Sequence, residues 1–425
     1  MTTTETYPVA EALTLAPDAA NHAAIADHLV SLRLRQLAKL ADLSRRLWPE
    51  SPAALADLLT RLPEMPGPQR GVLADDPFFY ASFTGLVAAL RINDRPAARR
   101  SLARLVPTLL LPAAGLISAP IAVEVGAGGA LGLHAAGPRL SLGPDAAGHT
   151  VMISADAGGL LGWRLDRERQ GTIAAGLPGC HGSALVAGTR ATSFDGDDER
   201  LPAMLIEIGA DPSGFATETV APVTPTSKMR EQLAACFERL GARWPEIRAE
   251  IEESVRLIVP IRSRRTSAFS NTAWQGAVFL RDDFADPLFL VERLVHESSH
   301  IRLNAAMVFS PLHHHAWDDR VDSPFRAGPR PVTGLIHGAF VFTRAAEALL
   351  RVSVETPSAH RGAAQARALL DKVSNALATV RSAVRLTDHG ECLIGEISAA
   401  HAALLEQCGD AQPTENPSDY LLEEI

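Results

Sequence analysis

Apolar residues recur every three or four positions over long stretches near both ends of the chain, and this spacing predicts amphipathic helices. The first stretch covers about residues 21–47, where leucine and isoleucine form a dense stripe. A second runs from residue 228 to about 257, and three more follow between residue 332 and about 407. Both ends of the chain are therefore predicted to be mainly helical.

The pattern changes after Pro112, where short apolar runs alternate with glycine, aspartate and proline. Such runs are typical of strands joined by turns. The predicted strands of this part are Ile121–Val125, Leu140–Leu142, Val151–Ile153 and Leu205–Ile208. A linker at Pro222–Ser227 follows, and a further pair of strands is predicted at Arg256–Ile261 and Gly276–Leu280.

These changes divide the chain into four regions. A helical N-terminal region is predicted for residues 1–111 and a strand-rich region for residues 112–226. A helical, metal-binding catalytic region follows at 227–410, and an acidic tail at 411–425. The predicted fold class is α+β: mainly helical, with a strand-rich middle region and a helical metal-binding C-terminal half.

Composition narrows the partners that the chain is expected to have. With 425 residues, 47% hydrophobic and 21% charged, it has the composition of a globular protein with a sizeable core. A formal net charge of −9 argues against nucleic acid or an anionic membrane as the main partner. No secretory signal and no membrane-spanning run are visible, so we expect a cytoplasmic protein with reduced cysteines. The sequence leaves the oligomeric state open.

The candidate chemistry is concentrated in one predicted helix, where a His-Glu-x-x-His motif occupies residues 296–300 inside an apolar stripe. Asp286 is placed to cap this helix, and Pro287 suits its first turn. His296 and His300 lie four residues apart and share one face of the helix. Their imidazoles are therefore predicted to converge on one metal ion.

A catalytic metal typically takes three protein ligands and keeps an open position. His337 is the favoured third ligand, because the flanking Gly334 and Gly338 would let its helix approach the motif helix closely. A histidine run at 313–315 lies in a polar, proline-rich loop and is the alternative source of a ligand. The other interpretation of His337 is a core histidine that is hydrogen-bonded to a carbonyl.

A zinc metallopeptidase is one function that the motif allows, with Glu297 as the catalytic general base that activates water. The metzincin extension requires glycine and histidine where this chain has Leu303 and Ala306. A gluzincin-type carboxylate would have to be Glu347, whose surroundings differ from the usual signature. These departures weaken the peptidase interpretation.

Two blocks, in order, resemble a known family. The first contains Gly-Ala-Val-Phe-Leu followed by Leu-Val-His-Glu-x-x-His, and the second is Ser-Pro-Phe-Arg-x-x-Pro-Arg-Pro-x-x-Gly-x-x-His-Gly-x-Phe-Val-Phe. From about Ser267 to Leu350 the chain is similar to the HExxH-motif, 2-oxoglutarate-dependent peptide β-hydroxylases that modify ribosomally made peptides. A later Leu386-Thr387-x-x-Gly390 matches weakly. Gly328 stands where that family often has an aspartate.

The resemblance implies an iron(II) centre with His296, His300 and His337 as ligands, 2-oxoglutarate as co-substrate and a precursor peptide as substrate. Imidazole ligands suit iron, and three of them leave positions for a bidentate 2-oxo acid and dioxygen. In such an enzyme Glu297 need not be a base, and we expect it to orient His300 or a bound water.

The distal carboxylate of 2-oxoglutarate needs a cation, and arginine supplies a planar, bidentate partner. Arg330 is the preferred candidate and Arg326 the second, because both belong to the block that resembles the family. Two other functions stay open at this point. One is the zinc peptidase, and the other is a metal-stabilised peptide-binding scaffold whose function resides in the N-terminal half.

Overall fold

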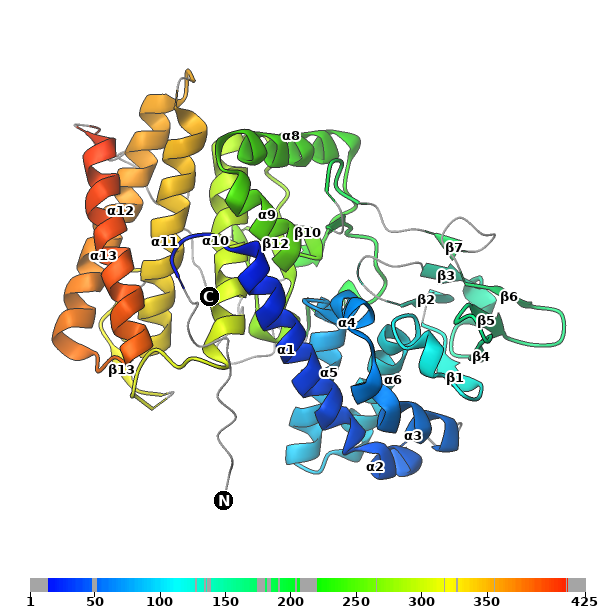
Figure 1. Ribbon diagram of the computed structural model, residues 1–425. Coiled ribbons are helices and arrows are strands. Elements are labelled where there is room, and N and C mark those ends of the chain that lie inside the picture. The colour runs from blue at the N-terminus through cyan, green and yellow to red at the C-terminus, as the bar shows by residue number, and fades with distance from the viewer. Residues whose placement is uncertain are drawn as a thin grey trace.

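The computed structural model describes residues 14–409 and 411, apart from 48–51, 127, 134, 136–138, 174–179, 182–184, 190–191, 203–204, 207–219, 265, 317, 326–327 and 355. The predicted acidic tail therefore lies outside the described residues, except for position 411. The described part of the chain is α+β and mainly helical, with its strands in the middle of the sequence, as predicted (Figure 1).

The α-helices are α1 (Ala19–Ala38), α2 (Ala41–Leu47), α3 (Pro52–Arg61), α4 (Gly67–Leu73), α5 (Pro77–Arg91), α6 (Arg95–Leu110), α8 (Ser227–Arg243), α9 (Pro245–Ser254), α10 (Pro287–Met307), α11 (Val332–Ser353), α12 (Ala359–Ala383) and α13 (Asp388–Cys408). Short 3-10 turns are η2 (Leu62–Glu64), η3 (Ala114–Leu116), η4 (Pro144–Ala146) and η5 (Thr272–Trp274).

The strands are β1 (Ile121–Glu124), β2 (Ala130–Gly132), β3 (Arg139–Ser141), β4 (Thr150–Ala155), β5 (Leu161–Arg164), β6 (Gln170–Thr172), β7 (Cys180–His181), β8 (Ser193–Phe194), β9 (Ala221–Pro222), β10 (Leu257–Arg262), β11 (Ala268–Phe269), β12 (Ala277–Arg281), β13 (Arg320–Val321) and β14 (Arg330–Pro331).

The motif helix α10 is held at the centre of the helical part of the molecule. Figure 1 shows α11 next to α10, with α12 and α13 on the far side of α11. The Asp286 side chain accepts from the backbone N–H of Leu288 at 2.9 Å, and Pro287 lies in the first turn, so both predicted start signals are confirmed. Nearly every residue of α10 is buried, which removes its polar side chains from water.

A five-stranded sheet supports the motif helix. Its central strands β10 and β12 run parallel, in register from Leu257 opposite Ala277 to Ile261 opposite Arg281, so the predicted strand pair is confirmed. Strands β8 and β9 also pair with β10. They come from the segment before residue 226, so this sheet spans the boundary predicted from the sequence. That boundary stays a prediction.

The strand-rich region forms two small antiparallel sheets, in the orders β1-β4-β5-β6 and β2-β3-β7. The predicted strands near residues 121, 140 and 151 are confirmed. The predicted strand Leu205–Ile208 is wrong where it is described, because Leu205 and Ile206 are helical. A short apolar run has no periodicity that separates a strand from a turn of buried helix.

Two predicted helices are each divided in two. The first ends at Ala38 and resumes at Ala41. The second ends at Arg243 and resumes at Pro245. Pro245 has no backbone N–H to donate and disfavours a helical conformation in the residue before it, so one helix stops and another starts there. Within the described ranges, no helix combines the length and apolarity needed to cross a bilayer.

The N-terminal helices are joined to the motif helix by buried polar contacts. His22 Nε2 lies 2.8 Å from Asp75 Oδ2, and both side chains are fully buried. Gln275 Nε2 donates to Asp75 Oδ1 at 3.0 Å and to the Ile301 carbonyl at 2.9 Å. Gly276 is at φ 91°, where a Cβ atom would lie 1.6 Å from the Asp75 carbonyl oxygen, so this close approach requires glycine.

Candidate metal centre

The three histidines predicted as ligands lie together between α10 and α11. His296 Nε2 is 3.2 Å from His300 Nε2, and His300 Nδ1 is 3.0 Å from His337 Nδ1. The rings of His300 and His337 are stacked, with centroids 5.3 Å apart. His296 and His337 are buried. The fold therefore brings the imidazoles together across 37 residues of sequence.

Part of this arrangement has the spacing of a metal site. Metal–nitrogen bonds of about 2.1 Å place two ligands of one ion roughly 3 Å apart, which the facing Nε2 atoms of His296 and His300 match. His337 instead faces the opposite nitrogen of His300. In the part of the chain that the structure describes, no group of three His, Cys, Asp or Glu side chains has a metal-site arrangement. The structure thus presents two facing imidazole nitrogens at the spacing of metal ligands, with a third imidazole beside them.

His337 occupies a buried position. Burial lowers the pKa of its imidazole to about 4, because the charged form loses its hydration. Its Nε2 lies 3.2 Å from the Met307 sulfur, at the end of α10. A neutral imidazole is the form that binds a metal, so this environment keeps His337 in the required state at neutral pH.

His296 is enclosed by a carboxylate and an aromatic ring. Glu292, one turn earlier on α10, has Oε1 3.8 Å from His296 Nδ1, and its Oε2 lies 2.9 Å from Arg293 Nε. The ring of Phe342 meets the His296 ring edge to face, with centroids 5.0 Å apart. The 3.8 Å separation is longer than a hydrogen bond, so Glu292 places negative charge near His296 Nδ1 without a direct hydrogen bond at this distance. Sequence analysis missed Glu292, although its spacing of four residues from His296 is a usable signal.

Glu297 is buried, and a residue of the five-stranded sheet region contacts its carboxylate. Its Oε2 accepts a hydrogen bond from Ser270 Oγ at 2.7 Å. Ser270 directly follows β11 at the sheet edge. Sequence analysis did not identify Ser270, because nothing in the local pattern links positions 27 residues apart. The expectation that Glu297 orients His300 or a water stays a prediction.

The predicted role of the two glycines needs correction. A Cβ atom at Gly338 would lie 2.2 Å from the ring of Phe325, whereas at Gly334 it would meet no atom of the described residues within 4 Å. Phe325 also stacks on Phe342 at 4.8 Å. Gly338 therefore makes room for a loop phenylalanine that stacks on Phe342, and the close approach of α10 and α11 does not depend on Gly334.

Of the two candidate arginines, the structure describes Arg330 but not Arg326. Arg330 lies in β14, seven residues before His337 and two residues before the start of α11. It is partly buried, and its Nε has no hydrogen-bond partner among the described atoms. Arg326 lies outside the described residues. Gly328 is at φ 83°, in the left-handed region that favours glycine, which is a backbone reason for glycine at this position.

The histidine run at 313–315 anchors a loop. His313 Nε2 contacts Thr333 Oγ1 at 3.0 Å, and His315 Nδ1 contacts Asp319 Oδ2 at 3.2 Å. His315 Nε2 also accepts from the backbone N–H of Arg385 at 2.9 Å. Both ring nitrogens of His315 are thus engaged in holding the loop against the connection between α12 and α13.

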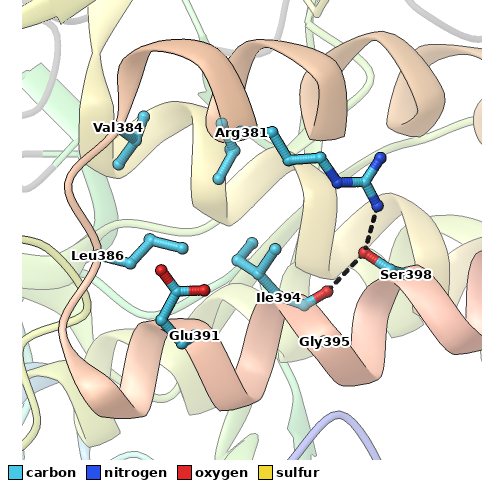
Figure 2. A pocket seen from close by; sticks show the side chains of 8 residues that line it. Arg381, Val384, Leu386, Glu391, Ile394, Gly395 and Ser398 are labelled. Carbon is cyan, nitrogen blue, oxygen red and sulfur yellow. Dashed lines mark hydrogen bonds between the residues drawn. The ribbon is translucent and has the colours of Figure 1, made fainter.

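A surface pocket of about 410 Å³ lies between the end of α12 and the first half of α13 (Figure 2). Val384, Leu386 and Ile394 give it an apolar lining, and Arg381 Nη2 donates to Ser398 Oγ at 3.1 Å on its rim. None of the predicted site residues lines this pocket. The candidate centre is instead a buried site between two helices.

Comparison with known proteins adds no information about the chemistry of this site. No protein-family model matches the chain, and no curated protein matches it significantly.

Proposed function

We propose that this protein is a non-haem iron(II)- and 2-oxoglutarate-dependent oxygenase that hydroxylates a β-carbon of a residue in a ribosomally made precursor peptide. The observation that carries the proposal is the pair of facing imidazole nitrogens, His296 Nε2 and His300 Nε2, 3.2 Å apart, with the buried His337 in contact with His300. The resemblance of residues 267–350 to the peptide β-hydroxylases supports iron over zinc.

The proposed metal ligands are His296 and His300, with His337 as the third. When bound, iron and the 2-oxo acid supply oxygen activation, so the protein provides binding, orientation and exclusion of water. Glu292 lies near His296 and pairs with Arg293, and Glu297 accepts a hydrogen bond from the Ser270 hydroxyl, so each carboxylate has a polar neighbour. Buried Phe342 packs on His296, and the Phe325 ring stacks on Phe342, so an aromatic pair covers one side of His296.

The proposed cation for the distal carboxylate of 2-oxoglutarate is Arg330, with Arg326 as the second candidate. The buried N–H at Arg330 Nε supports this role, because it has no hydrogen-bond partner among the described residues and such a donor gains most from an anionic acceptor. Arg330→Ala is expected to weaken 2-oxoglutarate binding by about 2–5 kcal/mol while metal binding is retained. Arg320→Ala, at an exposed site on the neighbouring strand β13, is the control. A large loss in Arg326→Ala instead would move the role to Arg326.

Metal titration of single variants tests the ligand set. One iron(II) per chain is expected for the wild type, and His296→Ala and His300→Ala are each expected to abolish tight binding. His337→Ala is expected to do the same, whereas Met307→Leu, which keeps the volume beside His337, is expected to retain it. Full affinity in His337→Ala together with loss in a variant of residues 313–315 would refute the assignment of the third ligand.

Mass spectrometry of a precursor peptide tests the reaction. Incubation with iron(II), ascorbate and 2-oxoglutarate under air is expected to add one oxygen atom, with substantial residual turnover in Glu297→Gln. Backbone cleavage that persists without oxygen and 2-oxoglutarate, and disappears in Glu297→Gln, would establish a zinc peptidase with Glu297 as the base. Peptide binding with neither reaction would establish a scaffold.

A further inference from the structure

Two fully buried arginines lie on the two helices that carry the histidines. Arg302 follows His300 by two residues on α10, and Arg344 follows His337 by seven residues on α11. The exposed fraction of each side chain is 0%. Two buried cations on neighbouring helices repel each other unless an anion lies between them.

Glu250 of α9 supplies that anion. Its Oε2 lies 2.8 Å from Arg302 Nη1, and its Oε1 accepts from Arg344 Nη2. Burial alone would raise the pKa of this carboxyl, but Arg344 and Arg302 outweigh burial and lower it. Glu250 is therefore ionised at neutral pH and joins the charges of α10 and α11.

The N-terminal segment closes the same cluster. The Asp18 backbone N–H donates to Glu250 Oε2 at 2.8 Å, and Arg302 Nη1 donates to the Ala16 carbonyl at 2.5 Å. The Leu15 backbone N–H donates to Glu396 Oε2 of α13 at 2.7 Å. Residues 15–18 thus contribute main-chain groups to a charge cluster whose other members are more than 200 positions away.

We propose that Glu250 is a positioning residue for the metal centre: by bridging Arg302 and Arg344 it sets the separation of α10 and α11, and with it that of His300 and His337. The proposal rests on the proposed function, since it concerns the same metal site. Helices are stiff over two turns, so a change in separation at the arginines is transmitted to the histidines of the same helices. Groups that hold metal ligands in place by direct hydrogen bonds typically change metal affinity 10–100-fold when they are removed, and we expect an effect of the same order from the loss of this bridge.

Cobalt(II) titration of the full-length protein, followed by visible absorption, tests the proposal at a temperature well below unfolding of every variant. Glu250→Gln keeps the shape but removes the charge, and it is expected to bind cobalt(II) about 10–100-fold more weakly, with an altered absorption spectrum. Glu246→Gln, at an exposed position one turn earlier on α9, is the matched control and is expected to behave as wild type.

A double variant separates positioning from general loss of stability. Glu250→Gln with Arg344→Met removes one of the two facing cations, so affinity is expected to recover by at least several-fold over Glu250→Gln alone. If Glu250→Gln does not fold, Arg344→Met in the wild-type background removes the bridge from one side. It is then expected to weaken cobalt(II) binding relative to Glu246→Gln.

The outcomes distinguish this proposal from the proposed function. Tight cobalt(II) binding by wild type and equal affinity in folded Glu250→Gln or Arg344→Met would overturn the positioning role alone. Absence of metal binding by the wild type would overturn both.

Discussion

The helices around the candidate metal centre and the strand-rich region each contain a carboxylate between two arginines, but the two clusters differ in burial. Glu250, Arg302 and Arg344 are each 0% exposed. Asp198 is 4% exposed, while its partners Arg139 and Arg200 are 26% and 18% exposed. The arginines of the second cluster therefore keep part of their hydration when the cluster is broken, and those of the first do not.

The clusters also differ in what they connect. Arg200 follows Asp198 by two residues, so that pair forms within a turn, and Arg139 adds one longer link. Glu250 joins three helices and the N-terminal segment. The comparison indicates that the same ion-pair chemistry serves local turn geometry in one region and the arrangement of helices in the other.

The largest effect is expected for Glu250→Ala. Removing one partner of a buried ion pair leaves uncompensated charge, so the free energy of unfolding is expected to fall by about 3–5 kcal/mol. Urea denaturation of the full chain at neutral pH measures this. Surface ion pairs contribute less than about 1 kcal/mol to the free energy of unfolding. A loss in that range for Glu250→Ala would show that water reaches the Glu250 cluster, and the two clusters would then not differ in burial.

Asp198→Asn is expected to have the next largest effect. Burial raises the pKa of the Asp198 carboxyl, but Arg200 and Arg139 outweigh burial and lower it to about 2 from 3.8. A shift of this size corresponds to about 2 kcal/mol of stability at neutral pH. The same urea experiment measures it. A loss equal to that of Glu250→Ala would contradict the ranking by burial.

The pH dependence of the stability difference between wild type and Asp198→Asn tests whether charge causes it. Because the folded-state pKa of Asp198 lies below the unfolded value, its contribution is present above pH 3.8 and is lost as the pH falls through about 2. The stability gap between wild type and Asp198→Asn is therefore expected to close from pH 5 towards pH 2. A gap that stays constant over this range would assign the effect to lost hydrogen bonds instead of charge.

The smallest effects are expected for two alanine substitutions on α11. In Gly334→Ala the new methyl group meets no atom within 4 Å in the described part of the chain, and the substitution is expected to stabilise the helix by about 0.5–1 kcal/mol. In Gly338→Ala the new methyl group would overlap the Phe325 ring, and overpacking of about 1–3 kcal/mol outweighs the helical gain. Thermal unfolding of the two variants measures whether each substitution stabilises or destabilises the protein. Stabilisation by both substitutions would show that Phe325 does not pack on α11.

The sequence by itself determined the local features of this protein. The cap at Asp286, the proline in the first turn and the apolar stripe specify α10, and the spacing of four residues puts His296 and His300 on one face. These features are predictable because helix start signals and side-chain directions depend on residues a few positions apart. The strands near residues 121, 140 and 151 were predicted from patterns that are equally local.

Only the tertiary structure decided which distant groups meet. The Ser270 hydroxyl on Glu297, the Phe325 ring over Gly338 and the Glu250 carboxylate between two arginines each join segments that no periodicity relates. It also decided that Leu205 is helical, since a short apolar run fits either state until its neighbours are in place. A sequence pattern fixes the face on which a side chain lies, whereas its partner depends on how several such faces are buried together.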